Sequence, residues 1–532
     1  MPGNDDAIRR VDANDNEDNH EQHALGTVRL QDFNTKERIL VPTPSNDARD
    51  PLSWSNPFRY YLAFLVCLSM ILCNFLAAGP AIAMSETIED LLDTEDEDWD
   101  RQVSQISFLF TTNSLFQGLG NLIWMPLVVK FGKRPVYIAS SAMYTITAIW
   151  VASARTYANA LVARIVMGFA SGSGECIAPL TISDLFFLHE RGTVMAMYTA
   201  SLNFGVSMGI ILSGLITLTL EWRYIYWIAS AMIGVLTIVV FFTMPETSFA
   251  RSQYLAHDSD TFRDDQTAAP PSRQCDRYVE TLRLYNGRFT NESFRTLFIR
   301  PILMLALPPV LWATLVMAVT IGFLVAITSN FSTAFADTYD FEAWQAGLCF
   351  IAGLLGSGFG IFFGGWFSDW IADCLTRRNG GTREPEFRLP AMTIGLLTTP
   401  LALALYGAGI ECQWHWTVPT VALGLLSFSI AQATSVSLVY IVDAYRPVVG
   451  ETVVTQLAFK SAFGFLLSFY TNPWIALDGY EDSFGAMAGI SACILVLWIP
   501  LFLYGKRIRH ASLAWPFIAS RIRWNPDRET GE

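Results

Sequence analysis

Three ionisable residues lie inside long apolar stretches, where a charge is costly. Arg164 and Glu175 share the stretch at about 158–180, and Lys460 lies in the stretch at about 453–476. Ionisable side chains in such surroundings face a wet cavity or a charged partner, so all three are candidates for proton coupling or substrate binding. A desolvated Glu175 can titrate near neutral pH or bind a cationic substrate. The structural alternatives are a carboxylate paired with a neighbouring helix and an arginine that donates hydrogen bonds between helices.

The spacing of Arg164 and Glu175 predicts that they share one face of a helix. They are eleven residues apart, which corresponds to about 16 Å of helix rise and nearly three full turns. Uncharged polar residues inside the stretches are further candidates for lining a substrate path or for joining helices. These are Asn74, Asn113, Gln117, Asn203, Gln345, Gln432 and Gln456.

The stretches that must position these residues are long enough to cross a membrane. Charged residues make up 16% of the 532-residue chain, against roughly 25% in soluble domains, and the mean hydropathy is +0.34. A membrane-spanning helix needs about 20 apolar residues, and continuous stretches are unlike the short alternating segments of a β-barrel. The sequence therefore predicts an all-α protein with twelve transmembrane helices, at about 59–84, 104–128, 134–154, 158–180, 193–218, 223–244, 303–330, 344–368, 389–410, 415–442, 453–476 and 483–505.

Two polar interruptions divide the chain into halves of six helices each. The first is the acidic, Asn-rich N-terminal segment, which lacks the apolar core of a signal peptide and is predicted to be disordered. The second is a linker with several aspartates and a Pro-Pro pair. The predicted organisation is a tail (1–57), a first half (58–245), a linker (246–300), a second half (301–505) and a C-terminal tail (506–532). Glu175 and Lys460 fall in opposite halves and could pair as a gate; a lysine that extends to the membrane interface is an equal alternative.

Charge asymmetry between the loops sets the expected orientation. The loops on one side of the predicted helices carry many Lys and Arg residues, whereas the other side carries only Arg101, Arg155 and Arg223. The positive-inside rule places the basic side, both termini and the linker in the cytosol. The first loop on the other side is strongly acidic from Glu86 to Asp100. Such a loop could concentrate cations, although a solvated charged loop is the simpler interpretation.

Several classes of function are disfavoured by composition and motifs. The net charge of −13 comes without a basic stripe or readout motif, which argues against a nucleic-acid partner. No GxxxxGK[ST] loop is present, so direct ATP hydrolysis is not expected. Six histidines, of which only His415 touches a predicted helix, at its first residue, and no CxxC pair argue against a metal or another cofactor. The chain is therefore not expected to be an enzyme, and a receptor is a remote alternative because its tails are short.

Charged turns recur at matching places in the two halves, as in duplicated transporters. Asp184, Glu190 and Arg191 follow the fourth predicted helix, and Asp443 with Arg446 follows the tenth. The turn after the second helix carries Lys133 and Arg134, and the one after the eighth carries Asp369, Arg377 and Arg378.

The sequence resembles the major facilitator superfamily over about residues 50–510, and within it the fungal twelve-helix drug:proton antiporters and histidinol/polyamine-permease-like members. The motifs that carry the resemblance are Asp50-Pro-Leu-Ser-Trp54, Phe131-Gly-Lys-Arg-Pro135, Arg164-Ile-Val-Met-Gly168, the segment 183–192, Glu221-Trp-Arg223, Pro245-Glu-Thr247, and the segment 378–389. The sequence departs from the family pattern at Met125 and Val129, which replace a Gly and an acidic residue, and in the fifth helix, where a Pro is missing beside Gly209.

The resemblance implies roles for the singled-out residues. It assigns Arg164 to a proton-coupling motif in a cavity-lining helix. It also implies that the residues of the charged turns form a conformational gate that holds the halves together; these are Lys133, Arg134, Asp184, Glu190, Arg191, Asp369, Arg377, Arg378 and Asp443.

The expected function is proton-coupled secondary transport of a small organic molecule by alternating access, with no cofactor. Efflux of a drug-like or secondary-metabolite compound is the leading hypothesis, and uptake of a small cation such as a polyamine is the alternative. The expected partners are the substrate, protons and the lipid bilayer, and the expected form is a monomer in a fungal plasma membrane. Asn330-Phe331-Ser332 is an N-x-Ser pattern, which makes Asn330 a candidate glycosylation site.

Overall fold

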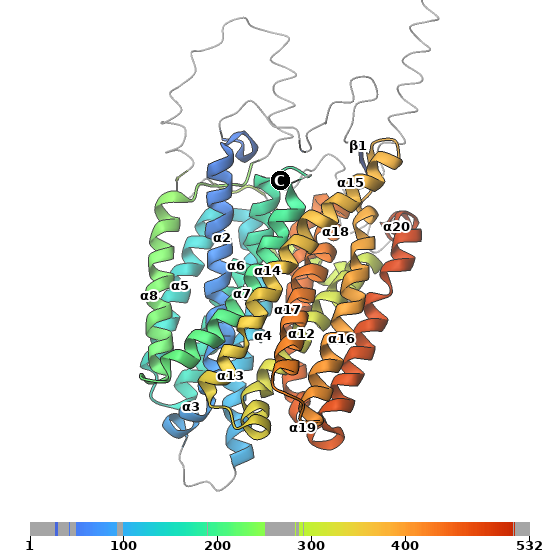
Figure 1. Ribbon diagram of the computed structural model, residues 1–532. Coiled ribbons are helices and arrows are strands. Elements are labelled where there is room, and N and C mark those ends of the chain that lie inside the picture. Colours follow the sequence, from blue (N-terminus) through green and yellow to red (C-terminus); the bar gives the residue numbers. More distant parts are fainter. Residues whose placement is uncertain are drawn as a thin grey trace, which may run out of the picture.

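The computed structural model describes residues 27–29, 42, 49–92, 99–188, 190–249, 282–283, 287–290, 292–513 and 515. These residues form a bundle of long, roughly parallel and antiparallel helices, with the first half of the chain on one side and the second half on the other (Figure 1). We call the end of the bundle at which α2 begins and α20 ends the terminal face, and the opposite end the far face. The predicted all-α class is confirmed.

The first half of the bundle contains six long helices. Each runs the length of the bundle, and short helical turns flank α2. The elements are η1 (Pro51–Ser53), α2 (Asn56–Ala78), η2 (Gly79–Ala83), α3 (Met84–Leu91), α4 (Trp99–Phe131), α5 (Lys133–Ser153), α6 (Tyr157–Leu185), α7 (Arg191–Ile216) and α8 (Arg223–Thr243).

The second half repeats this pattern with more interruptions. Two of its helices contain a π-helical turn, η3 and η5, at which the backbone locally widens. The elements are α11 (Phe294–Met304), α12 (Pro308–Tyr339), α13 (Ala343–Cys349), α14 (Ile351–Ile361), η3 (Phe362–Phe367), α15 (Ser368–Arg378), η4 (Pro385–Ala391), α16 (Met392–Glu411), α17 (Thr417–Ser429), η5 (Ile430–Thr434), α18 (Ser435–Ala444), η6 (Arg446–Val448), α19 (Val449–Leu495) and α20 (Trp498–Leu513).

Ten described helical segments are long and apolar enough to cross a membrane. One of them, 449–512, turns back at Gly479, whose φ of 82° suits glycine, and it therefore crosses twice. The 33-residue α4 is not among the ten but packs along α6. The described part of the chain is thus consistent with twelve crossings, six in each half.

The seventh crossing begins later than its apolar sequence predicts. Residues 303–330 were expected to be one helix, but α11 ends at Met304 and α12 starts at Pro308. Leu307 is extended, and Pro308 and Pro309 occupy the first helical positions, where a missing N–H costs nothing. The proline pair therefore sets the start of this helix.

Large apolar side chains lie on the outside of the bundle, and small residues lie between the helices. Large residues such as Phe64, Ile146, Phe242 and Leu397 are exposed on the outside of the bundle, as expected where the hydrocarbon is the solvent. Small residues lie where helices cross closely. Gly168 of α6 rests on the backbone of Asn113 in α4, where a Cβ would overlap the Asn113 carbonyl.

A short piece of the N-terminal segment pairs with the second half. β1 (Val28–Arg29) is antiparallel to β2 (Thr382–Arg383), which lies between α15 and η4. Figure 1 shows β1 beside α15 at the terminal face. The predicted boundaries of the tails and the linker fall mostly outside the described residues and stay predictions.

Candidate functional site

A cavity lies between the two halves and extends from the far-face ends of the helices into the middle of the bundle. It contains about 1040 Å³ of space not filled by protein atoms, part of it open to solvent. Its wall comes from both halves: Asn74, Ala77, Ala78, Ala81, Met84, Ser107, Phe110, Thr111, Ser114, Gln117, Glu175, Leu202, Asn203, Val206, Ile321, Leu324, Val325, Thr328, Ser329, Ile430, Lys460, Ser461 and Gly464.

An ion pair between the two halves closes the inner end of this cavity. Nζ of Lys460 in α19 donates a hydrogen bond to Oε1 of Glu175 in α6 at 2.8 Å. The Glu175 side chain is 1% exposed and that of Lys460 is 8% exposed. The sequence left two alternatives for Lys460: pairing with Glu175, or extending to the membrane interface. The structure shows the pairing.

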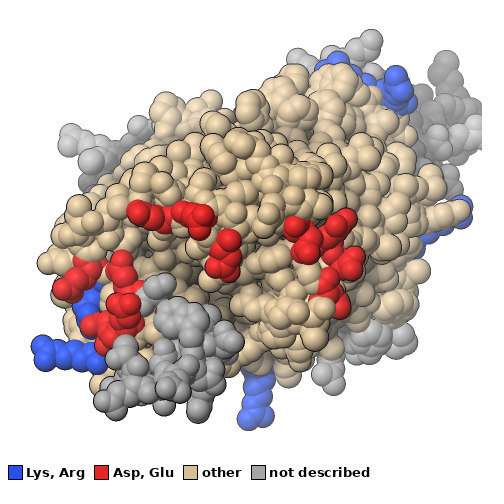
Figure 2. Space-filling model, turned by 60° about the horizontal axis from the view of Figure 1, so that its bottom comes forward, with Lys and Arg blue, Asp and Glu red and all other residues tan. Residues whose placement is uncertain are grey.

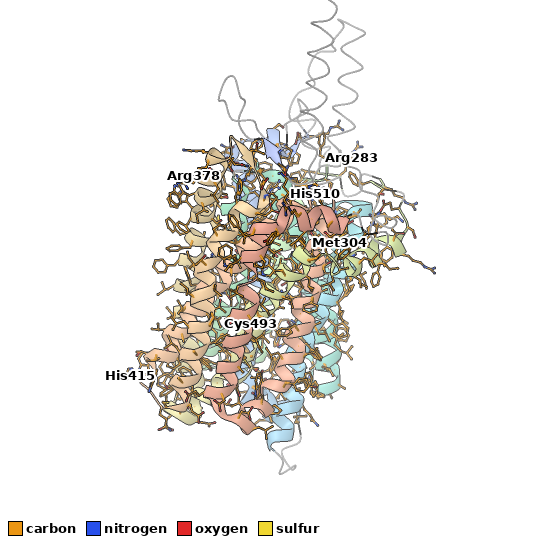
Figure 3. All side chains as sticks on the ribbon, turned by 90° about the vertical axis from the view of Figure 1, so that its right-hand side faces the viewer. Arg283, Met304, Arg378, His415, Cys493 and His510 are labelled. Carbon is orange, nitrogen blue, oxygen red and sulfur yellow. The ribbon has the colours of Figure 1, made fainter. Side chains whose placement is uncertain are left out.

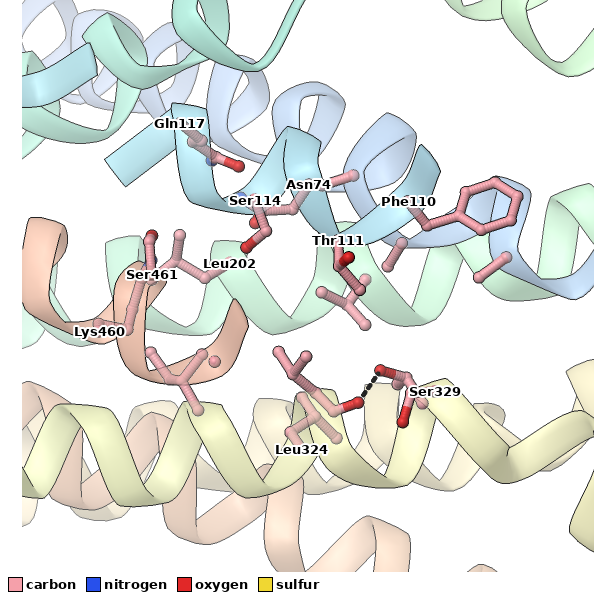
Figure 4. Close-up of a pocket in the computed structure, with 18 of the residues that line it drawn as sticks. Asn74, Phe110, Thr111, Ser114, Gln117, Leu202, Leu324, Ser329, Lys460 and Ser461 are labelled. Carbon is pink, nitrogen blue, oxygen red and sulfur yellow. Dashed lines mark hydrogen bonds between the residues drawn. The ribbon is translucent and has the colours of Figure 1, made fainter. Parts of the chain in front are cut away.

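Close helix packing brings the two charges together. A Cβ on Gly118 of α4 would overlap the side chain of Ser461 in α19. One turn of α6 before Glu175, Gly172 packs in the same way on the backbone of Gln117. Because α4 is held this closely by both partners, Glu175 and Lys460 reach each other beside Gln117. Figure 4 shows Gln117, Lys460 and Ser461 at one end of the cavity and Phe110 with Ser329 at the other.

Some polar atoms at this end of the cavity have no protein partner. Oε2 of Glu175 and Nε2 of Gln117 are buried without a hydrogen bond. By contrast, the amide of Asn74 donates to the carbonyl of Met70 at 2.9 Å, within α2. The amide of Asn203 donates to the carbonyl of Ser427 at 3.0 Å, across the interface between the halves. An acceptor and a donor thus stay available to a ligand.

A stripe of hydroxyl groups on α4 was missed by the sequence analysis. Ser107, Thr111 and Ser114 line the cavity, and their spacing of four and three residues puts them on one helix face. On the facing α12, Thr328 and Ser329 add two more hydroxyls. The signal was present in the sequence as a polar stripe with helical periodicity along an apolar helix.

Three of the seven candidate amides line the cavity, and four do not. Asn74, Gln117 and Asn203 are in the wall. Of the others, Gln432 donates to the carbonyl of Ala391, and Gln345 caps the start of α13. Asn113 and Gln456 are buried elsewhere in the bundle.

Arg164 lies in α6 like Glu175 but is not among the residues that line the cavity. Its Nη1 donates to the carbonyl of Leu76 in α2 at 3.0 Å. The guanidinium lies 5.0 Å from the ring centre of Phe110 and 5.1 Å from that of Tyr226. Phe110 also lines the cavity, and its ring therefore contacts both the cavity and the Arg164 guanidinium. Among the described residues no carboxylate lies within ion-pair distance of Arg164.

On the terminal face, ion pairs and hydrogen bonds hold the first half together. Lys133 pairs with Asp184 in the first half. The backbone N–H groups of Lys133 and Arg134 donate to Glu246 at 3.0 and 3.1 Å, which joins the start of α5 to the end of α8. Glu190 lies 3.8 Å from Arg59 of α2.

A second network crosses between the halves on the same face. Asp443 forms an ion pair with Arg388 at 3.4 Å and lies 3.8 Å from Arg191 of the first half. Asp369 pairs with Arg388 at 2.6 Å and with Arg383 at 3.8 Å. Thr193 of α7 donates to Asp369 at 3.4 Å. This cluster is buried: Arg388 has a 1% exposed side chain.

The arginines of the second network are not the expected ones. Arg377 and Arg378 were predicted to take part, but both are exposed at the end of α15, and Figure 3 shows Arg378 at the terminal face. Arg383 and Arg388, beyond the Gly380-Gly381 turn, bind Asp369 instead because the chain folds back over the helix there. Burial and then the neighbouring charge of Arg388 lower the pKa of Arg383 to about 10, against the opposing carboxylates.

Two further points from the sequence concern a glycosylation site and a metal site. Asn330 is 4% exposed within the C-terminal part of α12, and its side-chain atoms are buried. This placement does not suit a glycan, because an acceptor asparagine must be accessible in a loop. Within the described residues, no group of three His, Cys, Asp or Glu side chains could hold a metal ion.

The far face is acidic. Figure 2 shows red side chains across this face and blue ones mainly at its edge. Trp222 and Arg223 at the start of α8 bind Asp90, at 3.2 and 2.6 Å. Among the described residues, the exposed acidic side chains at the far-face ends of the helices are Glu89, Asp90, Glu221, Asp337, Asp340, Glu342, Glu411, Asp478, Glu481 and Asp482.

The chain is similar in sequence and in fold to known proteins. The family model "Major Facilitator Superfamily" matches residues 62–450. Protein HOL1 of Saccharomyces cerevisiae is 24% identical over 552 residues, with 91% of this chain and 92% of that protein covered. The MFS-type transporter penM of Penicillium rubens is 25% identical over 495 residues, with 91% and 93% covered. The partially occluded, inward open structure of the xylose transporter XylE from E. coli has a TM-score of 0.54 at 14% identity, covering 84% of this chain and 99% of that one.

Proposed function

The chain belongs to the major facilitator superfamily, and we propose that it is a proton-coupled secondary transporter of a small organic molecule. It is an integral membrane transporter and not an enzyme. In the proposed cycle, the halves rock about the central cavity, so that the cavity is accessible first from one face and then from the other. The ion pair between Glu175 and Lys460 is the single observation that carries the proposal.

Glu175 is the proposed site of proton exchange. A buried carboxylate needs a partner charge or a proton, because an unpaired charge in the bundle is strongly destabilising. When Lys460 leaves Glu175, the carboxylate must therefore bind either a proton or a cationic group of the substrate. Since it cannot bind both, proton and substrate would move in opposite directions, which is the logic of an antiporter.

The proposed direction is export. With the gradient directed into the cell, inward proton movement through an antiporter drives substrate outward. The positive-inside rule supports a cytosolic terminal face and hence an external far face. A fungal plasma membrane and a monomeric form are the matching proposals for location and assembly. A relative from Floropilus chiversii, 26% identical, is itself named efflux pump radE.

One observation favours a second candidate, uptake of a small cation. The acidic far face would raise the local concentration of cations at the external end of the cavity. If uptake were the function, proton and cation would enter together and an acidic exterior would raise net uptake.

The terminal-face ion pairs are proposed to act as the gate. Arg191 and Asp443 come from different halves, so this contact must break when the terminal face opens. The pairs inside each half, such as that of Lys133 with Asp184, would survive the movement. Arg164 would hold α6 against α2 during it, through the carbonyl of Leu76.

The test is a flux measurement with the full chain in proteoliposomes. A panel of labelled organic cations, zwitterions and neutral amphiphiles is offered with and without an imposed pH gradient. Export predicts that accumulation requires the proton gradient to run opposite to the substrate. Accumulation with protons moving alongside the substrate would support cation uptake, and transport that ignores the gradient would contradict proton coupling.

A further inference from the structure

The inner end of the cavity carries one positive and one negative charge. Among the described residues that line the cavity, Glu175 and Lys460 are the only charged ones. They neutralise each other at 2.8 Å and are almost fully buried. The cavity therefore has no net charge, but a positive and a negative group lie side by side at its inner end.

The charge type of a ligand decides what happens to this pair. A cation that takes Glu175 leaves the Lys460 ammonium buried without a partner, and an anion that takes Lys460 leaves Glu175 in the same position. Removing one partner from a buried pair is strongly destabilising. A ligand with both charges can replace the two contacts at once, so that neither buried charge is left alone.

The polar atoms around the pair that lack a hydrogen-bond partner also suit a ligand with both a donor and an acceptor group. Oε2 of Glu175 is a buried acceptor without a donor, and Nε2 of Gln117 is a buried donor without an acceptor. The ammonium of Lys460 has three N–H groups, of which one is directed to Glu175. A ligand that brings N–H donors to Glu175 and acceptor oxygens to Gln117 and Lys460 would satisfy all of them.

Apart from the pair, the wall combines apolar side chains with uncharged polar ones. Leu202, Val206, Ile321, Leu324 and Ile430 supply apolar surface together with small alanines. Hydroxyls occur there too, but no charged side chain of the described residues does. This part of the cavity suits a hydrocarbon or aromatic body.

We propose that the substrate is an amphipathic zwitterion, a molecule with an ammonium and a carboxylate on an apolar body. The ammonium would bind Glu175, the carboxylate would bind Lys460 and Gln117, and the apolar body would extend toward the far face. The inference rests on the proposed function, because it assigns the substrate to the same cavity.

A matched set of three probes tests the inference. L-Tryptophan carries both charges, tryptamine lacks the carboxylate, and 3-indolepropionate lacks the ammonium. Binding to the purified full chain in detergent is measured by calorimetry at pH 7. Tryptophan should bind at least about tenfold more tightly than either analogue, the factor expected for one charge-assisted hydrogen bond.

Two variants assign the preference to its residues. Glu175→Gln should remove the advantage of tryptophan over 3-indolepropionate, and Lys460→Gln should remove its advantage over tryptamine. Lys506→Gln serves as the control, because Lys506 is exposed on the terminal face and, within the described residues, forms an ion pair with Glu384 there. It should leave all three affinities unchanged.

Equal binding of tryptamine and tryptophan would overturn the inference in favour of a cation site. Equal binding of 3-indolepropionate would do the same in favour of an anion site, and absence of tryptophan binding at millimolar concentration would also overturn it. These outcomes leave proton coupling untouched, because coupling is measured as flux under a pH gradient. Conversely, a zwitterion preference without any effect of the gradient would retain this inference and contradict the proposed function.

Discussion

At the scale of single residues, burial and partner distinguish the two ionisable groups of α6. Glu175 faces the cavity and pairs with a residue of the other half. Arg164 is fully buried, but it donates to a backbone carbonyl and stacks between two rings. Both residues lie in α6, as their spacing predicted for one helix, but the spacing could not predict the Phe110 ring that packs on Arg164. We therefore propose a positioning role for Arg164.

Arg164→Ala should lower stability more than it changes coupling. It leaves the Leu76 carbonyl without a donor, which costs about 1–3 kcal/mol for a buried polar group. The thermal midpoint of the purified protein should fall, while the pH optimum of transport should stay in place. Arg164→Lys keeps the charge but loses the planar fork, so it should restore stability only in part.

Arg155→Ala is the control for Arg164, because Arg155 is exposed just before α6. It should match the wild type in both readouts. If Arg164 instead takes part in proton coupling, removing its charge in Arg164→Ala would shift the pH optimum of transport. Such a shift with unchanged stability would refute the positioning role.

At the scale of helices, small residues let the halves meet closely on the inner side of the cavity. Gly118 of α4 lies against Ser461 of α19, and Gly450 of α19 lies against Met125 of α4. Met125 occupies the position at which the family pattern has a glycine. The Met125 side chain packs against Gly450. At the position where the family pattern has a glycine, this chain therefore has an apolar contact between the two halves.

Gly118→Ala should favour opening of the terminal face. The added Cβ overlaps Ser461, and overpacking of this kind costs about 1–3 kcal/mol, or roughly a tenfold shift between conformations. Gln456→Cys, buried one turn from Lys460, reports the opening as faster labelling by a maleimide in a background without native cysteines. Gly485→Ala is the matched control, since a Cβ there meets nothing within 4 Å. Equal labelling in both variants would show that the seam does not control opening.

The sequence was informative about helices and less so about their contacts. Apolar length predicted the crossings, because each segment must satisfy its own backbone in the membrane. It predicted a break between residues 476 and 483, but it could not show that the chain turns back at Gly479, since this depends on one positive φ value. Nor could it choose between Asn203 and Gln432, because only the packing decides which amide meets the cavity.

The charged turns show the same limit. Their residue types predicted an ion-pair network, and Asp369 and Asp443 are in it. The loop after α15 decides which arginines can reach them. Two glycines with positive φ turn the chain there, and Arg383 and Arg388 then lie over Asp369 while Arg377 and Arg378 face outward. A turn geometry of this kind is not readable from charge alone.

At the scale of the whole molecule, the structure shows one conformation of the bundle. On the terminal face, Asp443 binds arginines of both halves. Deeper, the Glu175–Lys460 pair again joins the halves. The cavity extends from this pair toward the far face. In the proposed cycle this is the state with the terminal face closed.

Arg388→Gln should destabilise this closed state. Asp369 and Asp443 would lose their shared partner, so buried carboxylates would be left with weaker pairing. Labelling of Gln456→Cys should rise several-fold as the terminal face opens. Arg378→Gln removes an exposed arginine of the same face and should have no effect. A rise with Arg378→Gln as well would point to a general charge effect.

The proposed orientation has a direct test at the linker. Residue 265 lies outside the described residues and is predicted to be cytosolic. An Asp265→Cys variant should react with a membrane-impermeant maleimide only after the cells are permeabilised. Reaction in intact cells would reverse the assigned orientation, and the direction of transport would have to be reassigned with it.

The central claim is that Glu175 exchanges protons for substrate. The measurement is paired flux in proteoliposomes, with and without a pH gradient, for the wild type and Glu175→Gln at matched protein content. The account predicts that Glu175→Gln abolishes gradient-driven accumulation but retains equilibrating exchange, because a neutral group can still cycle with bound substrate. Full gradient-driven accumulation by Glu175→Gln would contradict the account and leave Glu175 with a structural role alone.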